Sequence, residues 1–248
     1  MSTLLKYTLR IADNSLILGQ RMAEWCSKGP TLEEDIAMSN IALDLFGQAN
    51  GFLEYASKID GQKTADDLAF KRDASNFYNF CLVEVENGHF GNTMIRSLLF
   101  DTFYLLFYKE LSKSQDENLS ALAFKSLKEI KYHFRHSQNW IIRLGDGTKE
   151  SNKKVQESLN NLWKYTDEFF EIDNVDQIMI DQKIGVNTSL LKKEWTEIIE
   201  STINEAKLIK PSTIKMITGG RDGKHSNKLS SLLKEMQYLP RKYPNAKW

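Results

Sequence analysis

Proline is absent from residue 31 to residue 210 of this 248-residue chain. Its four prolines are Pro30, Pro211, Pro240 and Pro244. Proline removes a backbone donor and breaks helices, so a long stretch without it is typical of long helices. Glycine is also sparse there, and the alternation typical of strands is hard to find. The sequence therefore predicts an all-α protein.

The predicted helices end at recognisable breaks. Gly29-Pro30 ends the first helix, a capping box at Thr31–Glu34 begins the second, and Gly145-Asp146-Gly147 stops the fourth. We expect long helices at about 4–29, 31–58, 90–111 and 117–144, a shorter irregular helix at 64–80, and further helices near 148–170, 188–209 and 225–238.

Four long helices with apolar stripes predict a four-helix bundle. The connection between the second and third long helices, about 59–89, is a long crossover of the kind found in ferritin-like bundles. No linker-like composition divides the chain. We therefore predict one ferritin-like domain, 1–248, with a core bundle at about 4–145 and additional C-terminal helices packed around it at about 148–248.

Composition excludes several classes of partner. Lys+Arg and Asp+Glu are balanced at 33 each, which argues against a nucleic-acid partner. No apolar run approaches the ~18 residues of a membrane span, and the apolar stretch 98–107 is expected to be a buried core helix. The N-terminus does not have the pattern of a signal peptide. Cys26 and Cys81 fit no metal or redox spacing, so we expect buried free thiols and a cytoplasmic protein.

One stretch, "KEIKYHFRHSQNW" at 128–140, has the spacing of metal ligands. Glu129, His133 and His136 follow one another at i, i+4 and i+7, on one side of a helix. A ferritin-like di-iron site, however, needs one Glu from each of two helices and a Glu-x-x-His from each of the other two.

The histidine count argues against that site. The four histidines are His89, His133, His136 and His225, so the first two helices have none. Where the second helix should carry Glu-x-x-His, the chain has Asp44-Leu45-Phe46-Gly47, and Tyr132 stands where the fourth helix should carry His. We predict no catalytic residue and no metal ligand in this chain.

Four polar residues remain at vestigial positions of such a site. They are Asp44, Asp101, Glu129 and His133. They could hold a single remnant metal ion, or form a hydrogen-bonded network with Lys128, Arg135 or Tyr132. The network is favoured, because buried polar groups must be paired whether or not a metal is present.

Six blocks of sequence resemble a known family: "DNSLILGQRMAEWC", "LEEDIAMSNIALDLFGQA", "DDLAFKRD", "VEVENGHFGNTMIRSLLFD", "SLKEIKYHFRHSQNWIIRLGDGT" and "GGRDGKHSNKLSSLLKEMQYLPRKYPNAKW". From about residue 10 to Trp248, the chain resembles the non-catalytic ferritin-like subunits of bacterial phenylacetyl-CoA 1,2-epoxidases. The resemblance implies a hetero-oligomer in phenylacetate degradation, in which a catalytic partner of the same fold carries the di-iron centre. A reductase with FAD and an iron–sulfur centre would supply electrons from NADPH. No cofactor is expected in this chain.

The glycine-rich segment 218–228 could bind a coenzyme A phosphate through backbone amides and Arg221 or Lys224. It matches neither the Walker A nor the dinucleotide pattern. A turn capped by Ser226 or Asn227, with a contact to the partner subunit, is favoured instead. Arg221, Lys224, His225 and Trp248 are the candidate residues for an interface or a phosphate site.

The leading hypothesis is therefore a structural subunit, not catalytic alone but required in an NADPH-dependent epoxidase complex. The alternative is a free-standing helical oxidase or oxygenase with an atypical metal site, which the histidine count disfavours. A third class, a free-standing helical binding protein, requires a monomer that is stable without partners.

Overall fold

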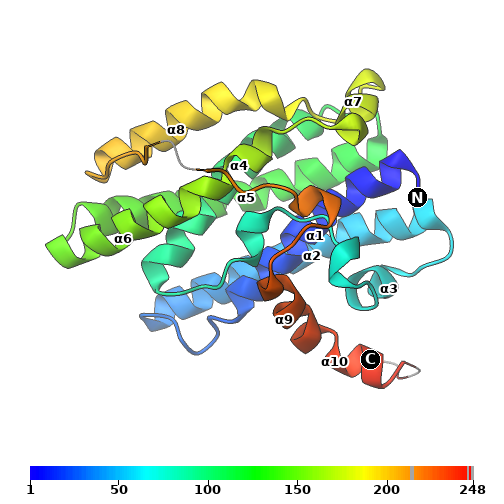
Figure 1. Cartoon of the computed structure of the whole chain (residues 1–248), viewed down its shortest axis with the longest axis horizontal. Coiled ribbons are helices and arrows are strands. Elements are labelled where there is room, and N and C mark those ends of the chain that lie inside the picture. The colour runs from blue at the N-terminus through cyan, green and yellow to red at the C-terminus, as the bar shows by residue number, and fades with distance from the viewer. Residues whose placement is uncertain (213–214, 245, 247–248) are drawn as a thin grey trace. The chain divides into compact units, whose positions relative to one another are not determined.

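The computed structural model describes residues 1–212, 215–244 and 246 (Figure 1). These residues are mostly helical and contain no β-strand, so the all-α prediction is confirmed. They form two compact units, Met1–Glu86 with Gly219–Trp248 and Asn87–Thr218. The single domain over 1–248 stays a prediction.

The first unit is built on an antiparallel pair of long helices, α1 (Thr3–Ala23) and α2 (Leu32–Asp60), which lie side by side (Figure 1). Thr31 begins α2 as predicted, because its hydroxyl accepts a hydrogen bond from the Glu34 amide at 3.4 Å. Gly61, with a left-handed φ of 73°, ends it. Phe46 packs against Gly19, where a Cβ would lie 2.8 Å from the ring.

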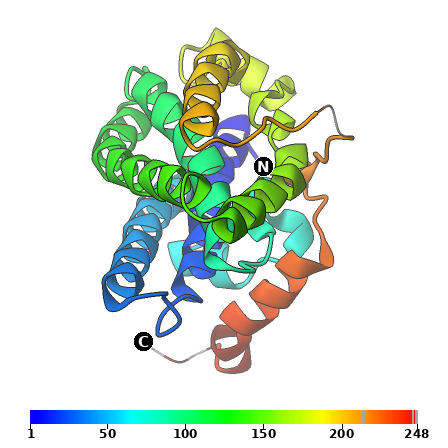
Figure 2. The ribbon, with the colours of Figure 1, turned by 90° about the vertical axis from the view of Figure 1, so that its left-hand side faces the viewer.

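Short elements complete the first unit. They are α3 (Ala65–Phe70), η1 (Ala74–Asn76), η2 (Cys81–Glu84), η6 (Gly220–Asp222), α9 (Asn227–Met236) and α10 (Tyr238–Lys242). Figure 2 shows α9 continuing through a bend into α10. The last part of the chain therefore packs with its first part, and α9 contacts η1.

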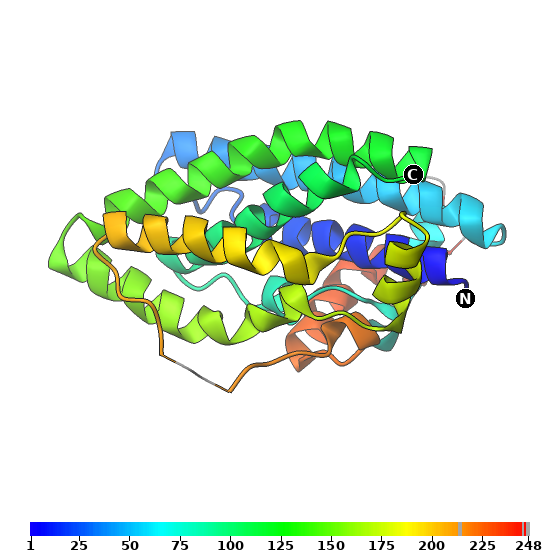
Figure 3. The same ribbon diagram turned by 90° about the horizontal axis from the view of Figure 1, so that it is seen from above.

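The second unit is built around α4 (Phe90–Leu111) and α5 (Glu117–Gly145). Two further helices, α6 (Lys149–Leu162) and α8 (Lys192–Glu205), pack on both of them (Figure 3). The remaining elements are α7 (Asn174–Asp181), η3 (Trp163–Tyr165), η4 (Asp167–Phe170) and η5 (Thr188–Leu191).

Helix α4 forms the core of the second unit, as predicted for the apolar stretch 98–107. Most of its side chains are buried, and the Phe103 ring stacks on Phe169 at 4.9 Å between centroids. The buried Trp195 indole donates to the Leu99 carbonyl at 3.1 Å and so ties α8 to α4. This helix needs no polar face because neighbouring elements cover it on several sides.

The observed boundaries agree with most of those expected. The third and fourth long helices are α4 and α5 almost to the residue, and Ser226 caps α9. The first helix ends at Ala23, earlier than predicted, because the chain turns through Ser27 with φ 65° and the Asp35 carboxylate accepts from the Gly29 amide at 3.0 Å. Helices α7 and α10 were not predicted, because both are short and α10 contains the helix-breaking residue Pro240.

Two further expectations concern the burial of the cysteines and the presence of membrane-spanning helices. Cys81 is buried as expected, but Cys26 is exposed because it lies in the turn after α1, so the prediction of two buried thiols was wrong for Cys26. In the part of the chain that the structure describes, no helix combines the length and apolar character of a membrane span.

Candidate functional site

The α4–α5 pair carries a buried polar cluster, formed by Arg96 and Asp101 of α4 with His133 and Ser137 of α5. All four side chains are nearly inaccessible to solvent. The Ser137 hydroxyl donates to Asp101 Oδ2 at 2.9 Å and joins the two helices directly. Arg96 Nη2 donates to Asn87 Oδ1 at 2.6 Å, which fixes the guanidinium near the start of α4.

Asp101 has an unusual acidity. Burial raises the pKa of its carboxyl from 3.8 to about 7, although the nearby charges of His133 and Arg96 and the Ser137 hydrogen bond each lower it. The desolvation penalty of the carboxylate is thus only partly offset by its neighbours. Near neutral pH the cluster can hold or release a proton at Asp101.

The other vestigial positions are less enclosed. Glu129 lies one turn before His133 on α5 and is partly exposed, as is Asp44 on α2. Asp44 belongs to the first unit and the other three residues to the second. Gly47 is exposed, and a Cβ there would meet no atom within 4 Å.

The buried cluster does not fit a metal ion. Its donors are one carboxylate, one imidazole and one hydroxyl, and the Arg96 guanidinium brings a positive charge that opposes a cation. Across residues 1–212, 215–244 and 246, no group of three or more His, Cys, Asp or Glu side chains is placed to hold a metal. The arrangement is a hydrogen-bonded and charged network between two helices.

The second set of candidates, in segment 218–228, lies against η2 of the first unit. His225 Nε2 is 2.9 Å from the Phe77 carbonyl oxygen, and its Nδ1 is 3.4 Å from Glu84 Oε2. The Ser226 amide donates to the other oxygen of the Glu84 carboxylate at 3.0 Å. Burial lowers the pKa of His225, but the contacts with Glu84 and Phe77 and the charge of Asp13 together raise it.

This loop is held by the protein itself. Arg221 is buried, and its carbonyl accepts from Arg10 Nη2 at 3.3 Å. Gly223 has a left-handed φ of 78°, and a Cβ there would lie 2.3 Å from the Ser75 carbonyl oxygen. Lys224 alone of the three candidates here has an exposed side chain. The loop therefore packs as a turn, and its glycine permits close approach to η1.

The structure describes the C-terminal tail only in part. Trp248 lies outside the described residues. Tyr243 is 50% exposed, with Lys242 Nζ 5.6 Å from its ring centroid.

Sequence reasoning missed a buried ion pair in the first unit. Both terminal nitrogens of Arg72 donate to the Asp13 carboxylate, one of them at 2.9 Å, and the Tyr78 amide donates to the same carboxylate at 2.9 Å. A buried ion pair of this kind must be fully hydrogen-bonded to be stable. Asp13 lies in a buried stretch of α1 that also contains Arg10 and Asn14, so no signal in the sequence set this carboxylate apart.

Fold and cluster together define an all-α protein of the ferritin-like class, with a polar network where two long helices meet. The model of the family described as "Phenylacetic acid catabolic protein" matches residues 1–248, and the chain belongs to that family. A curated relative from Escherichia coli (strain K12), named as the C subunit of 1,2-phenylacetyl-CoA epoxidase, is 42% identical over 248 residues, covering 100% of both chains.

Proposed function

We propose that this chain is the structural, non-catalytic subunit of a multicomponent phenylacetyl-CoA monooxygenase that forms the 1,2-epoxide in phenylacetate degradation. The observation that carries the proposal is the 42% identity to the Escherichia coli epoxidase subunit over the full length of both chains. Because the identity extends over both chains from end to end, an equivalent place in a complex is expected.

The chain's own residues support a non-catalytic role. The pattern Asp44-Leu45-Phe46-Gly47 offers no imidazole on α2, and the α4–α5 cluster pairs its carboxylate with a hydroxyl and two basic side chains. Such a network fixes the register of two packed helices. In this proposal a catalytic partner of ferritin-like fold holds the di-iron centre, and a reductase with FAD and an iron–sulfur centre interacts only indirectly with this chain.

A surface on α2 supports a partner contact. Leu32, Ile36 and Leu43 are 73%, 53% and 65% exposed, and their spacing of four and seven residues places them on one side of the helix. Large aliphatic side chains exposed together favour association with another protein. We name these three residues the α2 apolar surface.

Co-expression tests the proposal. The catalytic subunit of the epoxidase is produced with and without this chain, and phenylacetyl-CoA consumption is assayed with the reductase and NADPH. We expect turnover only when this chain is present, together with co-purification of the two subunits.

Two results would contradict the proposal in different ways. Equal turnover with and without this chain would remove its supporting role. Turnover by this chain with the reductase alone would show that it is catalytic, and would favour a free-standing oxygenase with an atypical metal site.

A further inference from the structure

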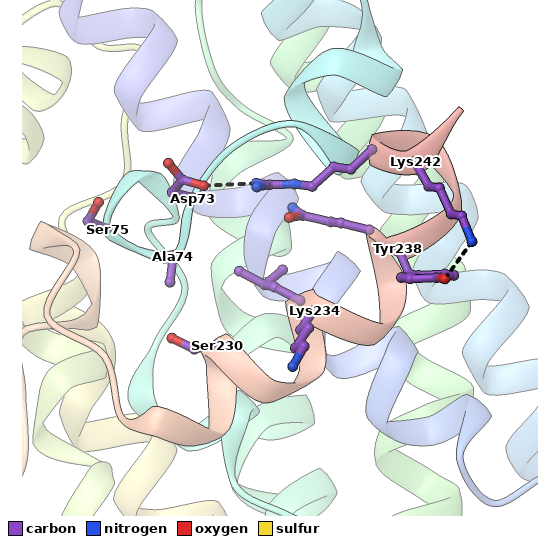
Figure 4. A pocket seen from close by; sticks show the side chains of 10 residues that line it. Asp73, Ala74, Ser75, Ser230, Lys234, Tyr238 and Lys242 are labelled. Atoms are coloured by element: carbon purple, nitrogen blue, oxygen red, sulfur yellow. Dashed lines mark hydrogen bonds and ion pairs between the residues drawn. The ribbon is translucent and has the colours of Figure 1, made fainter. Parts of the chain in front are cut away.

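The C-terminal helices present a hydroxyl- and lysine-bearing face to a pocket of the first unit. Ser230, Lys234, Tyr238 and Lys242 recur every four residues through α9 and α10, and all four line a pocket of about 720 Å³ (Figure 4). Its opposite wall is formed by Asp73–Ser75, at the start of η1. Both walls belong to the first unit.

The pocket carries an excess of positive charge. Asp73 is its only carboxylate among the described lining residues, and Arg241 Nη2 donates to it at 2.9 Å and to the Arg72 carbonyl at 2.9 Å. Lys242 Nζ donates to the Tyr238 hydroxyl at 2.9 Å. Within the described part of the chain, neither Lys234 nor Lys242 has a carboxylate partner.

The lining chemistry selects a class of ligand. Two ammonium groups that lack a carboxylate partner among the described residues favour an anion, and lysine is a common ligand of phosphate. The Ser75 and Ser230 hydroxyls can donate to phosphate oxygens, and the Tyr238 ring lines the same pocket. The volume lies within the range of about 300–1,000 Å³ that is usual for small-molecule sites.

We propose that this pocket binds an organic phosphate of nucleotide size, with Lys234 and Lys242 holding the phosphate and Tyr238 contacting the organic part. The site differs from segment 218–228, where Arg221 is buried and His225 is engaged by Glu84 and Phe77. It does not depend on the proposed role as an epoxidase subunit.

Calorimetric titration of the full-length chain with ADP at low salt tests the site. We expect saturable binding that weakens by at least about tenfold in Lys234→Gln/Lys242→Gln, because two charge-assisted contacts are lost. The matched control is Lys58→Gln, an exposed lysine on α2 outside the pocket lining, which should bind ADP as the unaltered chain does.

Further ligands separate phosphate recognition from other binding. Adenosine should bind much more weakly than ADP, whereas inorganic pyrophosphate should compete with it. The proposal is overturned if the unaltered chain does not bind ADP, if adenosine binds as well as ADP, or if the double variant keeps full affinity. Lys234 is exposed, so the single variant Lys234→Gln gives the same test with a folded chain if the double variant is unstable.

Discussion

At the scale of single residues, Asp101 couples the stability of the second unit to pH. Its pKa is about 7 in the folded chain and near 3.8 when unfolded, so between these values the folded state binds more protons. The contribution of this group to stability therefore falls as pH rises from about 4 to about 7. We expect Asp101→Asn, which stays neutral and can still accept from Ser137, to unfold at higher urea than the unaltered chain at pH 8, with a smaller advantage at pH 5.

The control for this prediction is Asp66→Asn, because Asp66 is exposed on α3. Its urea midpoint should follow that of the unaltered chain at both pH values. If the difference in urea midpoint between Asp101→Asn and the unaltered chain is the same at pH 5 and pH 8, then Asp101 is ionised in the folded protein across this range.

Prediction from sequence succeeded where local chemistry decides the outcome. The breaks after residue 111 and near Gly145 follow from turn-forming residues, and the Ser226 cap follows from its hydroxyl. Asp101 and His133 could be singled out because they interrupt apolar stripes. Their neighbours Ser137 and Arg96 could not, because only the packing of α4 on α5 brings them together.

At the scale of elements, the α2 apolar surface should act as one contact. We expect Leu43→Asp to reduce co-purification with the catalytic subunit by at least about tenfold, since a charge there must be desolvated at an apolar contact. Leu43 is 65% exposed, so the free chain should keep its helical circular dichroism. Leu190→Asp is the matched control, because Leu190 is 74% exposed but lies on η5. Equal loss of co-purification in both variants would rule out a specific role for α2.

The packing of α9 on the rest of the first unit should weaken as pH rises. Burial lowers the pKa of His225, but its contacts with Glu84 and Phe77 raise it overall, so protonated His225 stabilises the folded state. That contribution is fully present below the unfolded value near 6.5 and is lost as pH rises through the raised value. We expect amide protection in α9, corrected for intrinsic exchange, to fall between pH 6 and pH 8.

The variant Glu84→Gln tests the cause of this dependence. It removes the carboxylate beside His225 but keeps an oxygen that can accept from the Ser226 amide. In this variant, the protection of the α9 amides from hydrogen exchange should be nearly independent of pH over the same range. A dependence as steep as in the unaltered chain would assign the effect to another group.

At the scale of the whole molecule, membership of the family extends over residues 1–248 while the di-iron ligand pattern is incomplete. The chain therefore has the helices of the family without the histidines that the di-iron pattern requires at positions 47 and 132. Packing in the second unit depends on apolar contacts of α4 and on the network around Asp101, none of which requires an ion. Absence of the ligands is compatible with a stable chain because the buried Asp101 carboxyl accepts from Ser137 and lies near the charges of His133 and Arg96.

The incomplete ligand pattern gives a last prediction, on metal content. The purified chain should contain no stoichiometric iron, manganese or zinc by elemental analysis. Restoring the second-helix pattern with Asp44→Glu/Gly47→His should not create a metal site either. Gly47 is exposed, so an imidazole there would lie in open space, and Tyr132 would still replace the histidine expected on α5. Stoichiometric metal in the unaltered chain would contradict the structural role, and stoichiometric metal in the double variant alone would show that position 47 can reach other ligands after all.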